Sequence, residues 1–419
     1  MADNTSGEAR PPRLSAPDRG PDHDPRDAPR QERDRVLIVG GGFAGLYTAL
    51  ALAQKPGHPP ILLIEPNERF LFLPLLYELL SGELRRWEVA PRYDRLLASQ
   101  GVAWRRDRVT AIDTSQRRLL TATGQSHTYG RLVLATGSQL NSFGVPGVQE
   151  HALAFRSLED VDRLQTVIQR LRTERRPLQR LAIVGAGASG VELACKVADL
   201  LDGAALVELI EQGPSALPDC QPFNREQGLL ALQRRDVRLR TRTRVRAVTP
   251  DQLLLSQGGA GQEERQTSLP VAAVVWTAGF QVVPPPIQPT PARDSRGRLL
   301  CGPDLRLNGL KDVFVVGDLA ATAEPPGWPA TAQVAFQQAS CTAANLMRTI
   351  PGDALQPFAW NDLGEMLSLG RGDASLTSHG LTLAGPAAYQ LRRLAYLSRL
   401  PGLPHQLKVA AGWLADWPS

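Results

Sequence analysis

A buried strand, a glycine-rich turn and a helix follow one another twice in this chain, and this repeat constrains the fold most. Residues 36–39 (VLIV) form a continuous apolar run, which predicts a strand buried on both faces. Glycines follow at once, then an apolar-periodic helix over 46–52 and a second strand at 61–64. The same order returns at residues 181–184, 191–201 and 206–210. The sequence therefore predicts an α/β protein with two doubly wound, Rossmann-type dinucleotide-binding domains.

The first turn (GGGFAG) carries Gly40, Gly42 and Gly45. In such a turn the first glycine permits the sharp bend, the second lets backbone approach a pyrophosphate, and the third lets the helix pack on the strand. The N-terminus of the helix then faces the anion. Glu65 follows roughly 20 residues later, where a carboxylate can accept hydrogen bonds from ribose hydroxyls. Strand, helix and terminal acid together predict a dinucleotide site, whereas a glycine loop alone is a weak signal.

The second turn (GAGASG) repeats these elements with Gly185, Gly187 and Gly190, and its strand unit ends on Glu211. A carboxylate there bonds the adenosine 2′-hydroxyl and repels a 2′-phosphate. The next turn, residues 212–217, holds no arginine, so the sequence favours NADH over NADPH. Two units imply two dinucleotides, usually with FAD in the first and NAD(H) in the second.

Further strands are predicted as a meander over residues 102–121, at 237–255 and at 313–316, and a helix is expected to begin near Pro329. Three consecutive prolines at 284–286 cannot continue a ladder or a helix, and they predict a crossover between domains. We expect a disordered tail (1–34), a first FAD-domain segment (35–150), an NAD(P)H domain (151–284), a second FAD-domain segment (285–350) and a C-terminal region (351–419).

Composition narrows the function classes. The net charge of +5 over 419 residues suits an anionic surface but is too weak to argue for nucleic-acid binding by itself. The sequence has no basic run interleaved with aromatic residues, so a nucleic-acid-binding protein is not expected. Cys195, Cys220, Cys301 and Cys341 form no close pair, so neither a disulfide framework nor a flavin-linked dithiol is expected. No metal site and no transmembrane helix are predicted. The Pro-, Asp- and Arg-rich tail lacks the apolar core of a signal peptide.

Over residues 35 to about 372 the chain resembles the two-dinucleotide flavoprotein reductases, and within them the type II NAD(P)H:quinone oxidoreductases. The motifs that carry the resemblance are the two glycine loops and residues 73–78 (LPLLYE), 135–138 (ATGS), 190–192 (GVE), 276–279 (WTAG), 316–318 (VGD) and 332–337 (AQVAFQ). The stretch from residue 381 to 409 is similar to the cyanobacterial and plastid branch, which includes demethylphylloquinone reductases.

The resemblance implies roles for individual residues. Thr136, Gly137, Gly317 and Asp318 would line the FAD site, with Asp318 on the flavin ribityl chain, and Gly279 would belong to the cofactor sites. The helix expected near Pro329 would direct its dipole and its free N–H groups near Ala332 and Gln333 at the flavin and stabilise negative charge on it. Gln333 and Gln337 share one helix face and would meet the quinone. Glu192 would lie near the nicotinamide and flavin, although a first-turn glutamate stabilised by the helix dipole is an equal alternative.

The C-terminus carries the case for a membrane. Leu403, Leu407, Ala410, Leu414 and Trp417 recur at helical spacing, and an earlier stretch, residues 389–400, mixes leucines with arginines. Basic amphipathic helices that contain aromatic residues lie in a membrane interface rather than crossing it. A docking helix or a homodimer interface is the alternative. The expected location is peripheral, at the cytoplasmic face of a plasma or thylakoid membrane.

Taken together, these features predict an enzyme that takes hydride from NADH, with NADPH also open, onto FAD and passes the electrons to a membrane quinone without pumping protons. The acceptor would be a naphthoquinone, such as demethylphylloquinone, or a benzoquinone. One rival is a thiol-dependent or sulfide:quinone reductase, against which the scattered cysteines count. Another is a non-catalytic flavoprotein that senses redox state through bound NADH.

Overall fold

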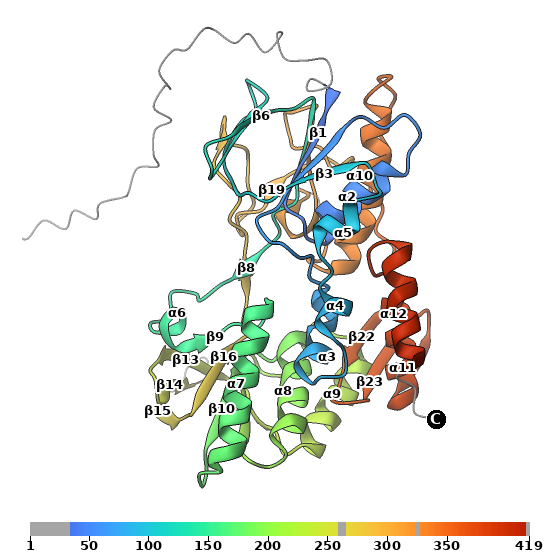
Figure 1. Ribbon diagram of the computed structural model, residues 1–419. Coiled ribbons are helices and arrows are strands. Elements are labelled where there is room, and N and C mark those ends of the chain that lie inside the picture. The colour runs from blue at the N-terminus through green and yellow to red at the C-terminus, as the bar shows by residue number, and fades with distance from the viewer. Residues whose placement is uncertain (1–33, 259–264, 324–326, 416–419) are drawn as a thin grey trace, which may run out of the picture.

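Two lobes joined at a narrow waist make up the computed structural model, which describes residues 34–258, 265–323 and 327–415 (Figure 1). Each lobe is built on a five-stranded parallel sheet, which confirms the predicted α/β class. The C-terminal helices run along one side of the molecule (Figure 1). The expected disordered tail lies outside the described residues, apart from Asp34.

The first lobe, at the top of Figure 1, holds the sheet formed by the first unit. Its strands, in spatial order, are β20 (Val313–Val315), β7 (Arg131–Leu134), β1 (Val36–Val39), β2 (Ile61–Ile64) and β3 (Val102–Arg105). Every residue of β1 and β2 is buried, which explains their uninterrupted apolar runs. The helices α2 (Phe43–Ala53) and α10 (Ala332–Arg348) pack against each other beside this sheet. Because β20 and α10 follow the second unit in sequence, the chain returns to complete the first lobe.

The second lobe repeats this plan. Its strands, in spatial order, are β12 (Arg238–Arg240), β11 (Leu206–Ile210), β10 (Arg180–Val184), β16 (Ala273–Trp276) and β9 (Ala152–Leu153). Its helices are α7 (Leu158–Glu174), α8 (Ala188–Leu201) and α9 (Pro222–Arg234). A small antiparallel sheet of β13 (Thr243–Val248), β14 (Gln252–Gln257) and β15 (Arg265–Pro270) adjoins it.

The chain crosses the waist where β8 (Gln139–Leu140) pairs with β17 (Phe280–Gln281). Residues 284–286 come after β17 and lead to β18 (Ile287–Gln288), which pairs with the first-lobe strand β4 (Val109–Asp113). The three prolines therefore lie on the return to the first lobe, as predicted.

The meander predicted over residues 102–121 is partly wrong. The first of its strands, β3, pairs in parallel with β2 and so belongs to the main sheet. Only β4, β5 (Arg118–Thr121) and the next strand, β6 (Ser126–Thr128), form antiparallel neighbours. Short strands carry too little periodicity to show which sheet they join.

The C-terminal region begins with a sheet that the sequence analysis missed. Its strands are β22 (Glu365–Ser368), β23 (Ala374–Ser378) and β24 (Leu381–Ala384), and they precede the expected helices α11 (Pro386–Leu397) and α12 (Leu403–Ala415). Trp417 lies outside the described residues. The remaining short elements are η2 (Leu73–Leu75), α3 (Leu76–Leu80), α4 (Arg86–Val89), α5 (Tyr93–Leu97), α6 (Val148–His151), β19 (Leu299–Leu300), η3 (Gly317–Leu319) and β21 (Ala320–Ala321).

Candidate active site

The three glycines of the first loop have different surroundings. Gly40 has a φ of +97°, and a Cβ there would overlap the carbonyl oxygen of Ala135, just past β7. A Cβ on Gly45 would overlap the Gly40 carbonyl oxygen, so α2 packs directly on the turn. A Cβ on Gly42 would meet nothing within 4 Å. The loop is thus closely packed at Gly40 and Gly45 and open at Gly42, as a backbone cradle for a pyrophosphate requires.

Donors and an acid complete this cradle. The helix α2 begins at the N-cap Gly42 with no side-chain cap and no acidic residue in its first turn, so its first N–H groups are available to an anion. Glu65 Oε2 accepts from the Gly41 N–H at 2.7 Å, and its Oε1 accepts from the Asn67 N–H at 2.8 Å. Oε1 also accepts from the Asn67 side-chain amide at 2.6 Å, so Oε2 is the oxygen that keeps a lone pair for a ribose hydroxyl.

Strand ends from distant parts of the sequence meet beside the first loop. Thr136 and Gly137 come after β7, and Gly317 and Asp318 come after its neighbour β20. The hydroxyl of Ser138 donates to Asp318 Oδ2 at 2.6 Å, which fastens the two ends together. The Thr136 Oγ1 is buried without a hydrogen-bond partner among the described residues. Such an orphaned hydroxyl fits a site completed by a bound group, and together these residues fit FAD.

The helix α10 starts at Ala332, and Thr331 caps it by accepting from the Val334 N–H at 3.2 Å. Gln338, on the buried side, accepts from the Gly317 N–H at 2.7 Å and so ties α10 to the end of β20. The N-terminus of α10 therefore lies at the edge where the strand ends meet, and its dipole favours negative charge there.

Gln333 and Gln337 lie on one face of α10, but their amides bond to the chain that continues after the helix. Gln333 donates to the Gly364 carbonyl at 3.2 Å and accepts from the Leu363 N–H at 3.1 Å. Gln337 donates to the Asn361 carbonyl at 2.8 Å and accepts from the Asn361 N–H at 3.0 Å. Each amide retains one N–H for another acceptor. Their contact with a quinone stays a prediction, and the contacts that the structure shows are with the backbone of residues 361–364 and with the Trp360 indole, which donates to Gln333 at 3.2 Å.

The second loop reproduces the first. Gly185 has a φ of +101°, and a Cβ there would lie 2.9 Å from the Cα of Ala278. A Cβ on Gly190 would overlap the Gly185 carbonyl oxygen, whereas one on Gly187 would meet nothing within 4 Å. Gly187 is the N-cap of α8, again without a side-chain cap or an acidic residue in the first turn. The second loop therefore fits a second pyrophosphate.

Glu211 and Gly279 lie at the same edge of the second sheet. Glu211 Oε2 accepts from the Ala186 N–H at 2.8 Å and its Oε1 from the Gly213 N–H at 2.6 Å, the arrangement seen at Glu65. Gly279 lies just past β16 with a φ of +67°, and the ring of Phe143 occupies the place of its Cβ. The acid is thus beside the loop, where the ribose of a bound dinucleotide would lie.

Glu192 connects α8 to the C-terminal region. Its Oε1 accepts from the Ser368 N–H of β22 at 2.8 Å, and the Arg392 guanidinium of α11 lies 3.8 Å away. Arg392 is buried and donates to Glu78 Oε1 at 2.5 Å. Lys196, one turn after Glu192, is also buried and forms an ion pair with Glu83. A buried ionic cluster therefore joins the two lobes and α11.

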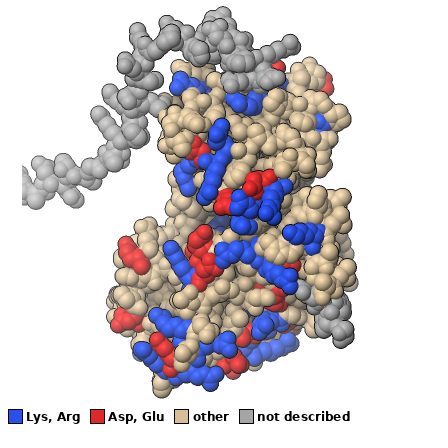
Figure 2. All heavy atoms as spheres, viewed as in Figure 1, with Lys and Arg blue, Asp and Glu red and all other residues tan. Residues whose placement is uncertain are grey.

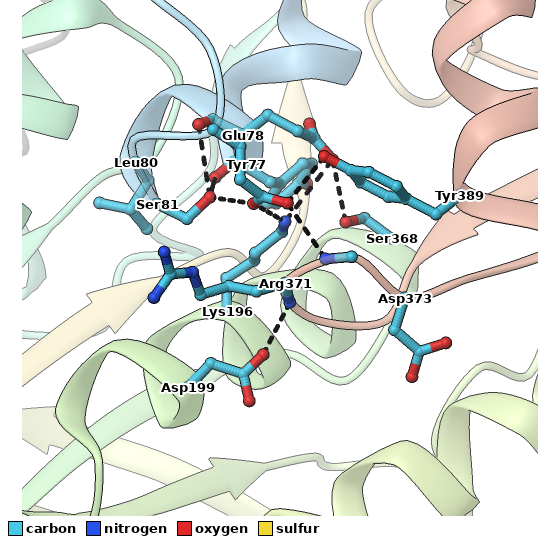
Figure 3. A network of polar contacts seen from close by, with 12 residues as sticks. Tyr77, Glu78, Leu80, Ser81, Lys196, Asp199, Ser368, Arg371, Asp373 and Tyr389 are labelled. Atoms are coloured by element: carbon cyan, nitrogen blue, oxygen red, sulfur yellow. Dashed lines mark hydrogen bonds and ion pairs between the residues drawn. The ribbon is translucent and has the colours of Figure 1, made fainter. Parts of the chain in front are cut away.

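Figure 3 shows the part of this cluster around Glu78 from close by, with Lys196 and Ser368 directed at Glu78 and Tyr389 beside them. The hydroxyl of Ser368 donates to Glu78 Oε1 at 3.1 Å, and the hydroxyl of Tyr389 donates to Glu83 Oε1 at 2.7 Å. Buried charges persist only where they are paired and hydrogen-bonded in this way, because removing one partner leaves a desolvated charge.

Burial raises the pKa of Glu192 to about 7, against the opposing effect of Arg392 and of the Ser368 N–H. A carboxyl with that pKa is partly protonated at neutral pH. It can release or accept a proton under conditions where an ordinary glutamate cannot. This property makes Glu192 a candidate proton carrier, and the alternative of a first-turn glutamate is wrong, because α8 begins at Ala188 and has no acidic residue in its first turn.

The four cysteines form no disulfide, and three of them are buried. Burial raises the pKa of all four thiols, to about 12 for Cys195 and Cys301. A reactive thiol needs a lowered pKa and access to substrate. The thiols of this chain therefore do not support the alternative of a thiol-dependent reductase.

The family model described as pyridine nucleotide-disulphide oxidoreductase matches residues 34–339. The chain belongs to this family. Among its relatives, demethylphylloquinone reductase of Synechocystis is 38% identical over 399 residues, which cover 92% of this chain and 98% of that protein. The alternative NAD(P)H-ubiquinone oxidoreductase C1 of Arabidopsis thaliana is 34% identical, over 92% of this chain and 82% of that protein.

Solved structures agree with this membership at the level of the fold. NDH2 of Plasmodium falciparum in complex with NADH has a TM-score of 0.79 at 15% identity, with 90% of this chain and 96% of that chain covered. The sulfide:quinone oxidoreductase of Aquifex aeolicus has a TM-score of 0.73 at 19% identity. The sequence relatives confirm the resemblance to the type II NAD(P)H:quinone oxidoreductases. Since these relatives are oxidoreductases, this protein is an enzyme, as predicted.

Sequence reasoning missed several residues of the site. Arg392 lies in the stretch of leucines and arginines that predicts an amphipathic helix, Lys196 was not singled out, and nothing in the spacing of either residue marks it as buried. Gln338 lies beside the motif glutamines but was not singled out. Glu78 lies within residues 73–78, so the motif itself was the one available signal.

Proposed function

We propose that the enzyme binds FAD at the first loop and NADH at the second, and that it reduces a membrane quinone. The observation that carries this proposal is the pair of glycine loops with the same packing, closed at both ends and open at the centre. When bound, FAD would supply the redox chemistry that links a two-electron nicotinamide donor to a quinone acceptor.

The protein would supply position and electrostatics. The N-termini of α2 and α8 would bind the two pyrophosphates, and Glu65 and Glu211 would orient the ribose groups. The N-terminus of α10 would stabilise negative charge at the flavin edge. Glu192, with a pKa near neutrality, would exchange the proton that quinone reduction consumes.

For the acceptor we propose a naphthoquinone, in keeping with the demethylphylloquinone reductase among the relatives, with a benzoquinone as the second candidate. The remaining N–H groups of Gln333 and Gln337 would donate to a quinone carbonyl. We also propose that this electron transfer is not coupled to proton pumping. Within the described ranges, no helix is long and apolar enough to cross a bilayer.

The approach from a membrane is supported by the outer faces of α11 and α12. Leu391 and Leu394 of α11 are 43% and 58% exposed, and Leu403, Leu407 and Leu414 of α12 are 64%, 61% and 73% exposed. Five exposed leucines on two adjacent helices form an apolar face suited to a lipid interface. Elsewhere on the face drawn in Figure 2, basic and acidic side chains intermingle at the waist rather than gathering by sign. We place this surface on the cytoplasmic side, where NADH is available.

A turnover assay that crosses NADH and NADPH with short-tailed and long-tailed quinones tests the function. Steady-state reduction of quinone by NADH is expected, together with bleaching of the flavin absorbance by NADH alone. Flavin that is bleached but never reoxidised by any quinone would favour the non-catalytic redox sensor.

A liposome assay tests the membrane surface. Truncation is unsuitable, because Arg392 and Val409 are buried and their removal would take from Glu78 its hydrogen-bonded cation and open the core. The triple variant Leu403→Glu, Leu407→Glu, Leu414→Glu changes exposed side chains only. It should lose co-sedimentation with anionic liposomes while keeping FAD and the turnover of a short-tailed quinone. If liposome binding persists and a dimer dissociates instead, α12 is a subunit interface.

A further inference from the structure

Two residues past β12, the strand next to Glu211, an arginine lies beside the second site. The Glu211 N–H donates to the Arg240 carbonyl at 2.8 Å, and the Arg242 N–H donates to the Gly213 carbonyl at 2.8 Å. Because β11 and β12 are parallel neighbours, their carboxyl ends meet at one edge of the sheet. Arg242 therefore stands directly beside the turn that carries Glu211 and Gly213.

Arg242 differs from the arginines that precede it on this strand. The side chain of Arg240 donates to the buried Glu208 at 2.7 Å, and that of Arg238 lies 3.9 Å from the same carboxylate. Arg242 is exposed, and within the described part of the chain its side chain has no ion pair or hydrogen bond. Its φ of 50° is unusual for a residue other than glycine and turns the chain sharply at this point. Its positive charge is available to a ligand.

The first lobe offers an internal comparison. Its corresponding backbone bond runs from the Glu65 N–H to the Arg105 carbonyl at 3.1 Å, so the position equivalent to Arg242 is Asp107. Asp107 is buried and accepts from the Arg108 N–H at 2.7 Å. Arg106, next to it, lies 3.9 Å from Glu68. The adenosine ribose of FAD carries no phosphate at its 2′ position, and the equivalent place in that lobe holds a buried carboxylate that accepts from the Thr123 hydroxyl, not an exposed cation.

We infer that Arg242 is a specificity-determining residue that binds the 2′-phosphate of NADPH and so opposes Glu211. This inference rests on the proposal that the second loop binds a nicotinamide dinucleotide. Both oxygens of Glu211 already accept a backbone N–H, which lessens its repulsion of a phosphate. An arginine beside the ribose supplies charge-assisted hydrogen bonds to a phosphate. The enzyme therefore uses NADPH as well as NADH.

The matched variants are Arg242→Gln and Arg172→Gln. Arg172 is equally exposed and belongs to the same lobe, but it lies at the end of α7, just before β10 begins and thus at the opposite edge of the sheet. Binding of 2′,5′-ADP and of 5′-AMP is measured by calorimetry, and kcat/KM is measured for NADPH and for NADH with a soluble quinone.

Arg242→Gln should weaken 2′,5′-ADP binding and lower kcat/KM for NADPH by about tenfold or more, with 5′-AMP and NADH changed by less than about twofold. Arg172→Gln should change none of the four values. Equal losses for both nicotinamides, or equal losses in both variants, would overturn the inference. If 2′,5′-ADP binding depends on Arg242 while no quinone is reduced, the inference stands and the proposed function fails. If quinone is reduced and kcat/KM for NADPH is unaffected by Arg242→Gln, the proposed function stands and the inference about Arg242 fails.

Discussion

The two glycine loops have similar backbone geometry, but their surroundings differ. In both, two glycines are packed against neighbouring backbone, the middle one is open, and a glutamate accepts from the loop N–H. The first loop is covered: the Tyr93 hydroxyl of α5 donates to the Gly41 carbonyl at 2.6 Å, and Glu65 is only 7% exposed. The corresponding bond to Ala186 comes from the backbone N–H of Leu217, and Glu211 is partly exposed.

The difference in how far the two loops are covered arises from the segments that follow Glu65 and Glu211 in sequence. Four short helical elements, η2 to α5, lie between β2 and β3 and bring Tyr93 over the first loop, whereas α9 alone lies between β11 and β12. A covered site suits a cofactor that stays bound, and an open site suits one that must leave after each turnover. One local pattern can therefore serve retention or exchange, depending on the length and packing of that segment.

The residue two positions after the last loop glycine extends the comparison. In the first unit this residue is Tyr47, whose hydroxyl donates to the Arg399 carbonyl, and in the second it is Glu192, beside Arg392. Both nucleotide units thus contact the C-terminal helical segment through the same helix position. The C-terminal region is therefore a shared support for both sites.

The largest expected effect is the loss of one cofactor but not the other when the open glycine of one loop is replaced. Gly42→Val should yield colourless protein, because a branched side chain fills the open centre of the first loop. Gly187→Val should stay yellow but show no flavin reduction by NADH. Flavin absorbance of the purified proteins and anaerobic NADH titration measure both effects. Full flavin content in Gly42→Val would contradict the assignment of FAD to the first loop.

The second effect concerns Glu192, which has a tyrosine as its counterpart in the first unit. Its pKa rises from 4.5 to about 7 on folding, so between these values the folded protein binds a proton more tightly than the unfolded chain. Stability should therefore fall as the pH rises through this window, by about 3 kcal/mol at most. Glu192→Gln should flatten that slope, and the exposed Glu150→Gln should not. Urea unfolding at pH 5 and pH 8 measures the change in stability with pH. An equal change in the wild type and in Glu192→Gln would contradict a raised pKa for the buried Glu192 carboxyl.

A smaller effect tests whether the two acids have equivalent roles. Glu211→Gln should narrow the preference for NADH over NADPH by about 1–2 kcal/mol, roughly tenfold, because the charge that repels a 2′-phosphate is gone. Glu65→Gln should weaken FAD binding and leave that preference unchanged. The ratio of kcat/KM values for NADH and NADPH measures the preference in both variants, and the flavin content of the purified protein measures FAD binding. A wild-type enzyme that already prefers NADPH would show that Glu211 does not discriminate.

The smallest effect tests the cover over the first loop. Tyr93→Phe removes one buried hydrogen bond, worth about 1 kcal/mol, so FAD should dissociate roughly fivefold faster while the KM for NADH is unchanged. Release of flavin fluorescence on dilution measures the rate. An unchanged rate would mean that the covering segment does not retain the cofactor.

By itself the sequence determined the two units, their order and the acids that end them, and it predicted near Pro329 a helix that begins at Ala332. Each of these is signalled by local spacing: apolar runs for buried strands, glycines at a turn, and an acid at a strand end. The outer leucines of α12 were predictable for the same reason, because helical periodicity is local. The domain bounds stay a prediction.

Tertiary structure alone decided which distant residues meet. It placed Arg392 between Glu78 and Glu192, bound Gln333 and Gln337 to residues 361–364, and set Arg242 beside Glu211. A search of residues 212–217 could not find Arg242, because it arrives on the neighbouring strand. Pairing between strands and burial of charge depend on contacts across long separations in sequence, and no spacing within one segment records them.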